Sequence, residues 1–520
     1  MSCGYPPTGR HKPWHDQAVT ALQGQQLAGP LSAAVANLCV ALQPQVSPAT
    51  AAGFAEVLRR LQAPLQVAVA GRIKSGKSTL VNALIGRRVA PTDVGECTRL
   101  VTRFQYGNVD RVEVVFTDGR RLVLPFDADG MIPASLGVDV AQVSHVEAYL
   151  TNAVLRDFTV IDTPGLGSLD AASVARTEEL LDPVSRNAVA GAEAVLYVVT
   201  QGVRADDHQA IAAFTAATAS REAGPVNAFA VLNKVDAVAP ETVEGADGDV
   251  WRAAVILARK QAQLLKPRVA DVLPVISLLA ESAETGSFSA PDAESLRQLA
   301  QLDAETREMM LMSGDLFTSW ECDVPSGTRA RLLEKLDLHG IGEALKAVDA
   351  EPAITAGALR RKLLDSSGFA EVRGRLDAVF RARADGIKAA AALASVTSLS
   401  SADPGERRRV HDAIEVLLAK PEAHQLRLLE ALTLVVSGAV AMPEDLAEEV
   451  LRVGSTPDIP GRLGLAGRPV QELTAYALER AGWWRSFASF GATPAQGRVA
   501  HVVHRAYFLM WQQLRAGGQR

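Results

Sequence analysis

The chain has 520 residues, of which 48% are apolar and 22% are charged, and its formal net charge is −6. At about 150 residues per domain, this length and apolar content predict a globular protein with roughly two to four domains. The negative charge argues against nucleic acid as the main partner, and four scattered cysteines without a CxxC pair argue against a disulfide framework or a thiolate metal site.

The first half of the chain is predicted to hold two helices and then an alternating α/β region. After a polar tail, apolar residues at helical spacing indicate helices over 31–42 and around 54–61, and Pro64 ends the second. From residue 65 to about 277, strand-like and helix-like segments alternate, which predicts a largely parallel sheet. Strands are expected at 66–70, 157–162, 194–200, 227–233 and 272–277.

A β-rich stretch lies between the first two of those strands. It is interrupted by the pairs Gly107-Asn108 and Asp118-Gly119. Pairs of this kind form tight turns between neighbouring antiparallel strands. The sequence therefore predicts an antiparallel hairpin at one edge of the sheet.

After about residue 350 the chain has a helical pattern rich in alanine, leucine and arginine. Apolar residues at steps of four and three from Leu376 to Ala394 predict one long helix, and similar patterns predict helices around 429–440 and 499–514. The expected organisation is an N-terminal tail with neck helices at 1–63, an α/β domain at 64–350 and a helical bundle at 351–520. No segment reaches the roughly 18 uninterrupted apolar residues that would span a bilayer, so any membrane contact is expected to be peripheral.

A phosphate-binding pattern begins at Gly71, where the sequence reads GRIKSGKST. In the frame G-x-x-x-x-G-K-S, backbone N–H groups cradle phosphate oxygens, Lys77 reaches the outer phosphates and Ser78 binds Mg²⁺. An apolar strand before the loop and an amphipathic helix after it favour this interpretation over a glycine-bearing turn that binds nothing. The residues predicted to contact nucleotide here are Gly71, Ser75, Gly76, Lys77, Ser78 and Thr79.

A second motif, DTPG at 162–165, ends the next expected strand of the parallel region. In P-loop proteins a carboxylate at such a strand end holds the Mg²⁺ shell, and the following glycine offers its N–H to the γ-phosphate. The motif therefore adds three predicted nucleotide contacts, which are Asp162, Thr163 and Gly165.

The connection after the P-loop helix is expected to supply a threonine for the metal. GTPases place a threonine there whose hydroxyl coordinates Mg²⁺ and whose N–H touches the γ-phosphate. Thr98 is the preferred candidate, while Thr92 and Thr102 are alternatives, and Thr102 is expected to lie in the following strand. The predicted Mg²⁺ ligands are Ser78, Thr98 and Asp162.

A third motif, NKVD at 233–236, closes another strand and predicts which base is bound. An aspartate can accept both the ring N1–H and the exocyclic amine of guanine, a donor pair that adenine does not present. A further base-contacting loop should follow the strand that ends near residue 277. The three motifs come in the order that a GTPase needs, and the predicted base contacts are Asn233, Lys234, Asp236 and Ser277.

The sequence resembles the dynamin-like large GTPases, specifically their bacterial branch, and most of all the mycobacterial isoniazid-inducible dynamin-like proteins. The resemblance is carried by AGRIKSGKSTLVNALIG, APTDVGECTRLVTRF, VIDTPGLGSL, RARLLEKLDLHGIGEAL and LLDSSGFAEVRGRLDAVFRARADGIKA. It implies an α/β P-loop GTPase head, with a mostly parallel sheet, on an α-helical neck and stalk in which helices before the head pack against those after it. The helical part is short for the family and shows no hydrophobic paddle, which argues against direct membrane insertion.

The resemblance also bears on catalysis. Ras-like enzymes place a water-orienting glutamine directly after the DTPG motif, but this chain has Leu166, which cannot orient water. Lys74 lies where guanylate-binding and atlastin relatives carry an arginine finger in the same chain, whereas dynamins position a monovalent cation there. Lys74 is therefore the candidate for offsetting charge between the β- and γ-phosphates, and the alternative is a solvated loop lysine. The predicted catalytic residues are Lys74, Lys77 and Thr98.

Two segments of the helical region are candidates for contact with anionic lipid. Three consecutive arginines at 407–409 are expected in a turn after the long helix. Trp483, Phe487 and Phe490 recur at helical steps, for which packing inside the bundle is the favoured use. Residues 451–520 contain nine arginines and three acidic residues, a net charge of +6 that favours anionic headgroups.

The sequence thus predicts a Mg²⁺-dependent GTPase that couples nucleotide state to head–head association and to remodelling or maintenance of a bacterial membrane. It is expected in the cytoplasm, peripheral at the inner face of the plasma membrane, with a second copy, anionic lipid and a paralogous dynamin-like protein as partners, and no nucleic acid. The alternative is a regulatory GTPase switch that acts on a protein or ribosomal partner without deforming lipid. A scaffold without turnover is disfavoured because Lys77, Ser78, Thr98 and Asp162 are residue types that a hydrolase needs.

Overall fold

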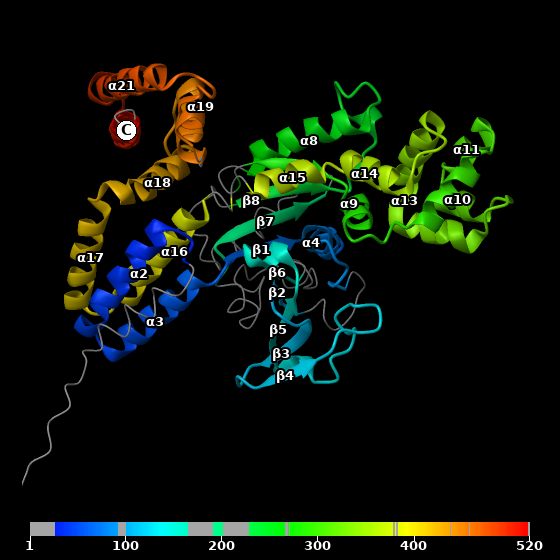
Figure 1. Cartoon of the computed structure of the whole chain (residues 1–520), viewed down its shortest axis with the longest axis horizontal. Coiled ribbons are helices and arrows are strands. Elements are labelled where there is room, and N and C mark those ends of the chain that lie inside the picture. The colour runs from blue at the N-terminus through cyan, green and yellow to red at the C-terminus, as the bar shows by residue number, and fades with distance from the viewer. Residues whose placement is uncertain are drawn as a thin grey trace, which may run out of the picture.

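A central sheet with helical parts on either side makes up the protein (Figure 1). The computed structural model describes residues 27–91, 100–164, 191–200, 228–265, 269, 271–377, 380, 383–436, 438–456 and 458–517. Within these ranges the sheet has nine strands in the order β4-β3-β5-β2-β6-β1-β7-β8-β9. Their bounds are β1 Leu65–Gly71, β2 Thr102–Tyr106, β3 Arg111–Phe116, β4 Arg121–Leu124, β5 Val143–Leu150, β6 Phe158–Asp162, β7 Ala194–Val199, β8 Ala228–Asn233 and β9 Val272–Val275.

The half of the sheet from β6 to β9 is parallel, and the other half is mixed. Strand β1 pairs in parallel with β6 on one side and β7 on the other, and β8 and β9 continue the series. Strand β2 then runs antiparallel to β6, while β3 runs antiparallel to both β5 and β4. This is the predicted mostly parallel sheet with an antiparallel edge.

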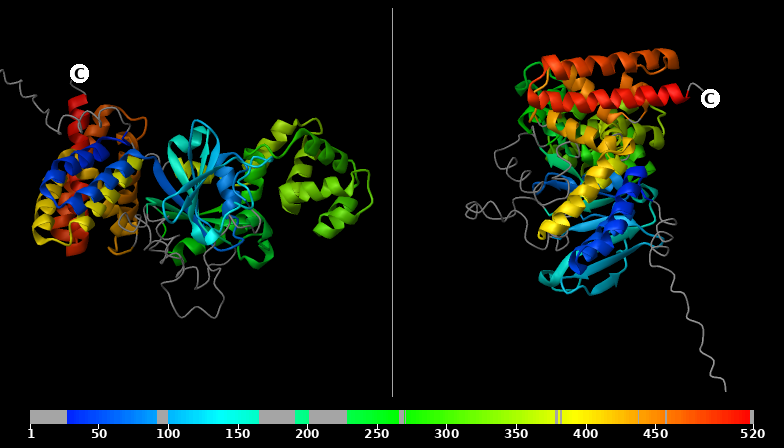
Figure 2. Two further views of the ribbon diagram at one scale, coloured as in Figure 1. Left: turned by 90° about the horizontal axis from the view of Figure 1, so that it is seen from below. Right: turned by 90° about the vertical axis from the view of Figure 1, so that its left-hand side faces the viewer.

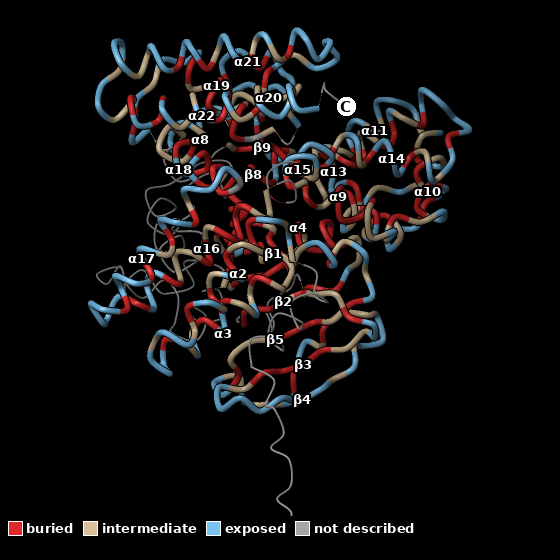
Figure 3. Tube along the Cα trace, turned by 60° about the vertical axis from the view of Figure 1, so that its left-hand side comes forward, coloured by how far each residue is buried: buried red, intermediate tan, exposed pale blue. Residues whose placement is uncertain are grey.

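Both faces of the parallel half are buried, which explains its near-continuous apolar strands. In β1, Ala68 and Ala70 enter one core, which lies under α8 and α9. The alternate residues Val67 and Val69 enter a second core with α4 and α15. Figure 3 shows the same pattern as buried segments along the central strands.

Further helices of the described ranges belong to the head and to a small helical lobe. The lobe consists of α10 to α12 with the first part of α13, on the side of the head away from the bundles (Figure 2). The bounds are α4 Lys77–Ile85, α8 Val250–Leu265, α9 Ser277–Glu284, α10 Ala290–Ala300, α11 Ala304–Met310, α12 Gly314–Ser319, α13 Ser326–Ala350, α14 Ala356–Ser366 and α15 Phe369–Leu376.

Two helical bundles stand on the opposite side of the head (Figures 1 and 2). The neck bundle contains α2 Pro30–Leu42, α3 Pro48–Gln62, α16 Ala384–Leu399 and α17 Pro404–Leu418, and these four helices share one core. The outer bundle contains α18 His424–Val436, α19 Glu444–Ser455, α20 Ile459–Leu463, α21 Val470–Ser486 and α22 Pro494–Gly517.

The neck bundle joins helices from before and after the head, as the resemblance implied. The carboxylate of Asp385 in α16 accepts hydrogen bonds from the N–H groups of Leu31 and Ser32 at 2.9 and 2.8 Å, and so caps α2. Glu406 in α17 accepts from the N–H of Ser47 and from the hydroxyl of Thr50, which lie at the start of α3. The predicted domain boundaries remain predictions. Helices α14 and α15 come after the predicted boundary at residue 350, yet they pack on the head.

The antiparallel edge differs from the predicted hairpin in one respect. The Asp118-Gly119 turn does join neighbouring strands, β3 and β4. The Gly107-Asn108 turn does not, because β5 lies between β2 and β3. Strand β5 was not predicted, and it pairs in parallel with β2 and antiparallel with β3.

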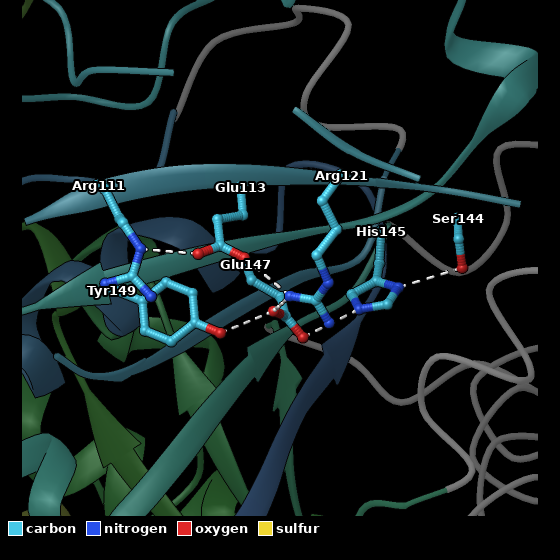
Figure 4. A network of polar contacts seen from close by, with 7 residues as sticks. All are labelled: Arg111, Glu113, Arg121, Ser144, His145, Glu147 and Tyr149. Atoms are coloured by element: carbon cyan, nitrogen blue, oxygen red, sulfur yellow. Dashed lines mark hydrogen bonds and ion pairs between the residues drawn. The ribbon is translucent and has the colours of Figure 1, made fainter. Parts of the chain in front are cut away.

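A network of polar side chains covers one face of this edge (Figure 4). Glu147 of β5 is at its centre and accepts hydrogen bonds from the Tyr149 hydroxyl and from Arg121 of β4, at 2.9 and 2.8 Å. Arg121 also donates to Glu113 of β3. Burial acts to raise the pKa of Glu147, but the hydrogen bonds from His145, Tyr149 and Arg121 outweigh it and lower the pKa to about 2.

Three predictions about the helical part were wrong. The expected long helix from Leu376 to Ala394 is two helices, α15 and α16. Leu376 and Phe380 pack into the core of the head, where the Phe380 ring lies 5.5 Å from that of Phe229. The arginines at 407–409 lie within α17 rather than in a turn, because the side chain of Asp403 caps that helix just before them.

The third wrong prediction concerns the aromatic stripe. Trp483 is 39% exposed and Phe490 is 93% exposed, so of the stripe only Phe487 packs against the bundle core. The neighbouring Trp484 is the buried residue instead, since its indole N–H donates to the buried carboxylate of Glu449 at 3.0 Å. Among the described residues, no helix is both long and apolar enough to cross a membrane.

Candidate nucleotide-binding site

The loop between β1 and α4 has the backbone geometry of a phosphate-binding turn. Gly76 adopts φ 90°, and a Cβ on it would lie 2.2 Å from the side-chain nitrogen of Asn233. A Cβ on Gly71 would lie 2.4 Å from the carbonyl oxygen of Val198 in β7. The two glycines are therefore required by close approach of neighbouring elements, and they hold the loop against the ends of β7 and β8.

Lys77 and Ser78 begin α4, and both reach other parts of the site. The Lys77 ammonium is buried and donates to the carbonyl oxygen of Arg72 at 2.9 Å, across the loop. The Ser78 hydroxyl donates to Asp162 Oδ2 at 2.9 Å. The predicted P-loop and the predicted strand-end carboxylate are thus brought together, as a phosphate and metal site requires.

Burial shifts the pKa values of the two charged groups of this site. Burial lowers the pKa of Lys77 despite the nearby Asp162, and burial raises the pKa of Asp162 despite Lys77, Ser78 and the N–H of Thr163. The second carboxylate oxygen of Asp162, Oδ1, is buried and has no hydrogen-bond partner among the described residues. A divalent cation with its water shell, next to Ser78 and Asp162, would fit this donor set.

Thr163 fixes the end of β6 beside the P-loop strand. Its hydroxyl and its N–H both donate to the carbonyl oxygen of Val69 in β1, at 2.8 and 3.3 Å. Because β1 and β6 are parallel, their carboxyl ends meet at one edge of the sheet, where ligands bind in open α/β sheets. Thr79 lies in the first turn of α4 at the same edge.

Asn233 ties the phosphate loop to the expected base loop. Its Nδ2 donates to the carbonyl oxygen of Ser75 at 2.8 Å, and its Oδ1 accepts from the N–H of Ser277 at 3.0 Å. Asn233 is buried and sits at the end of β8. Its side chain therefore links two predicted ligand loops to each other.

Asp236 has the environment expected of a ligand-binding carboxylate. Its Oδ1 is buried and has no hydrogen-bond partner within the described ranges. The Ser277 hydroxyl is likewise buried and without a partner there. Burial raises the pKa of Asp236, and the charge of Asp337 in α13 adds to that effect, while its own N–H, His339 and Lys234 oppose it. Lys234 itself is exposed, with a left-handed backbone at φ 59°. Two donors from a bound base would satisfy Asp236.

Some predicted residues lie outside the described residues, namely Thr98, Gly165, the alternative Thr92 and the noncatalytic Leu166. The other alternative, Thr102, begins β2 and pairs with Asp162 across the antiparallel ladder, as expected of a strand residue. Lys74 is exposed and has a left-handed backbone with φ 61°.

Asn82 in α4 was missed by the sequence analysis. It is fully buried in an otherwise apolar helix end, and its side chain makes four hydrogen bonds. The signal was available, since a polar amide inside the apolar run LVNALI is unusual unless its bonding groups are satisfied.

The fold and the arrangement of the strand ends define this part of the chain as a P-loop GTPase head. The family model described as Dynamin family matches residues 67–235. The isoniazid-induced protein IniC of Mycobacterium tuberculosis is 32% identical over 437 residues, which cover 83% of this chain and 86% of that protein. The chain therefore belongs to the dynamin family.

Further similarities are shorter or weaker. The bacterial dynamin-like protein of Nostoc punctiforme is 42% identical over 59 residues, or 11% of this chain and 8% of that protein. A solved structure described as an oligomerised bacterial dynamin pair aligns over 97% of this chain and 94% of its own, with 12% identity and a TM-score of 0.33.

Proposed function

We propose that the protein binds GTP with Mg²⁺ at this edge of the sheet and hydrolyses it to GDP and phosphate. The observation that supports this most is the convergence of Lys77, Ser78 and Asp162, together with a separate acceptor, Asp236, whose Oδ1 is buried. The first three suit phosphates and a metal, and the fourth suits the guanine donor pair. Membership in a family of GTPases supports the same reaction.

Each residue has a distinct part in this proposal. Lys77 and the loop N–H groups bind the β- and γ-phosphates, and Ser78, Thr98 and Asp162 orient the metal shell. Mg²⁺ bound there would supply charge that neutralises the phosphates. Gly165 offers its N–H to the γ-phosphate, and Asn233, Lys234, Asp236 and Ser277 form the base site.

Lys74 is proposed to supply the catalytic positive charge, since Leu166 cannot orient the attacking water. Its ammonium, carried by an exposed residue of the loop, would offset charge that develops between the β- and γ-phosphates. Because this stabilisation is larger in the transition state, Lys74→Ala should lower turnover roughly 10²- to 10³-fold with much less change in GTP affinity. Lys74→Arg should retain much of the activity, and K⁺ or Na⁺ should matter little. A parental rate for Lys74→Ala at saturating GTP would reduce Lys74 to a solvated loop residue.

The nucleotide cycle is proposed to drive head–head association and work on a bacterial membrane at its inner face. The corner between α21 and α22 supports lipid contact, because Phe490 is 93% exposed there. Next to it, Trp483 stacks on Phe487 with ring centroids 5.4 Å apart, and the Arg480 guanidinium lies 4.4 Å from the Trp483 ring. Exposed aromatic rings at a helix corner suit the interface of a bilayer. A paralogous dynamin-like chain is a proposed partner.

A regulatory switch that binds a protein or ribosomal partner is the second candidate function. The absence of a spanning helix among the described residues is compatible with both candidates. Co-sedimentation with anionic liposomes, with and without GTP, separates them. Binding that weakens in high salt supports the membrane role, and no binding in either nucleotide state favours the switch.

A further inference from the structure

Asn82 uses the whole bonding capacity of its side chain. Its Oδ1 accepts hydrogen bonds from the N–H groups of Val89 and Ala90, at 3.0 and 2.8 Å. Its Nδ2 donates to the Ala90 carbonyl oxygen at 3.1 Å and to Glu281 Oε1 at 2.7 Å. An amide offers two donor hydrogens and two acceptor lone pairs, so all are occupied. A buried residue of this kind fixes the relative positions of its partners strongly.

Two of these partners lie at the start of the chain that leads to Thr98. Val89 and Ala90 follow the end of α4, and Thr98 is the expected metal ligand further along the same connection. The carbonyl oxygen of Val89 also accepts from the N–H of Ile132 at 3.1 Å. The starting point of this connection is therefore held from both sides.

The remaining partner, Glu281, belongs to the helix of the base site. It is buried in α9, one turn after Ser277, whose N–H is bound by Asn233. Asn233 in turn binds the Ser75 carbonyl oxygen in the phosphate loop. A continuous path of hydrogen bonds and one helix thus runs from the phosphate loop through the base loop to Ala90.

We propose that Asn82 is a positioning residue for GTP hydrolysis. Together with Glu281, it fixes the start of the connection that leads to the metal-binding threonine relative to the base loop. The inference rests on the proposed GTPase function. Asn82 does not reach the nucleotide in this role. Its removal should therefore impair the metal-dependent step more than guanine nucleotide binding.

A purely structural role is the competing explanation, and Asn152 provides the matched control. The Nδ2 of Asn152 donates to the carbonyl oxygen of Ile85 at 2.6 Å, so it fastens the same end of α4. Within the part of the chain that the structure describes, Asn152 makes no hydrogen bond to Val89 or Ala90, and its Oδ1 accepts from the N–H of Val154. Asn152→Ala should lower thermal stability while leaving turnover within about twofold of the parent.

The experiment compares purified full-length variants in three measurements: GTP turnover, the Mg²⁺ concentration for half-maximal turnover, and GDP affinity in EDTA. Asn82→Ala should lower turnover at least about tenfold and raise the half-maximal Mg²⁺ concentration at least about threefold. GDP affinity should stay within about threefold. Glu281→Ala should move the first two quantities in the same direction, and Glu281→Gln should be less impaired because it keeps the oxygen acceptor.

A double variant makes the test independent of any one substitution. Because Asn82 and Glu281 share a hydrogen bond, the effects of Asn82→Ala and Glu281→Ala on turnover should be less than multiplicative. The proposal is overturned if Asn82→Ala folds and has parental turnover and Mg²⁺ dependence. If Asn82→Ala does not fold, the same result for Glu281→Ala overturns it. It is also overturned if GDP affinity falls as much as turnover. A parent chain without GTP turnover would instead refute the proposed function.

Discussion

A buried ion pair at the junction of head and neck gives the sharpest prediction about stability. Lys388 in α16 is 2% exposed, and its ammonium lies 3.3 and 3.4 Å from the two carboxylate oxygens of Glu193. It also donates to the carbonyl oxygen of Arg60 in α3, at 2.7 Å. Glu193 precedes β7 and accepts from the N–H of Gln66 in β1, at 3.1 Å. The pair therefore connects two neck helices to the strand that leads into the phosphate loop.

Removing the lysine should cost more than removing the pair. Burial raises the pKa of Glu193 and lowers the pKa of Lys388, which means that desolvation outweighs their mutual attraction. Lys388→Met removes the buried ammonium that faces the Glu193 carboxylate, which should lower the free energy of unfolding by about 3–5 kcal/mol. Replacing Glu193 by Gln as well keeps an acceptor for Gln66, and the double variant should recover at least about 2 kcal/mol of that loss.

Urea unfolding followed by circular dichroism at pH 7 measures these differences. The control is Lys346→Met, which breaks a pair between Lys346 and Glu343 at the surface of α13, where the lysine side chain is 77% exposed. That change should have no measurable effect, since exposed pairs contribute little. A parental unfolding midpoint for Lys388→Met, or a double variant no more stable than the single one, would refute this reasoning.

Three other predictions concern the base, the sheet edge and lipid. Asp236→Asn should weaken GTP binding more than about tenfold and gain affinity for xanthosine triphosphate, and unchanged GTP affinity in a titration would remove Asp236 from the base site. The lowered pKa of Glu147, about 2 against an ordinary 4.5, stabilises the fold by about 3 kcal/mol above pH 5, and this is lost as the pH falls towards 2. The stability gap between parent and Glu147→Gln should therefore close in acid, and a constant gap would contradict the assignment. Phe490→Ser with Trp483→Ser should reduce binding to anionic liposomes at least about threefold without changing GTP turnover, and equal binding would exclude the α21–α22 corner as the lipid contact.

The predictions that agree with the structure depend on local sequence. The apolar runs at β1, β6, β7, β8 and β9 lie within a residue or two of the predicted ranges, because fully buried strands leave a continuous apolar signal. The motifs directly follow these strands, so Lys77, Ser78 and Asp162 could be expected to meet once a parallel sheet was assumed.

The failures depend on contacts that are remote in sequence. Strand β5 inserts between β2 and β3, and a turn signal at Gly107-Asn108 does not say which strand the chain will pair with. Adjacent tryptophans gave no indication that Trp484 rather than Trp483 would be buried, since the choice depends on a carboxylate from α19. The bonds of Asn82 likewise end on Glu281 in another helix, which helical periodicity cannot predict.

Phosphate release from GTP by the purified chain tests the proposed reaction most directly, with ATP and the Lys77→Ala variant as controls. We expect Mg²⁺-dependent release from GTP that EDTA abolishes, much slower release from ATP, and a loss in Lys77→Ala, whose ammonium is held in the phosphate loop. The rate per molecule should rise with protein concentration if heads activate one another. Equal release from GTP and ATP, or an undiminished rate in Lys77→Ala, would contradict a guanine-specific hydrolase at this site.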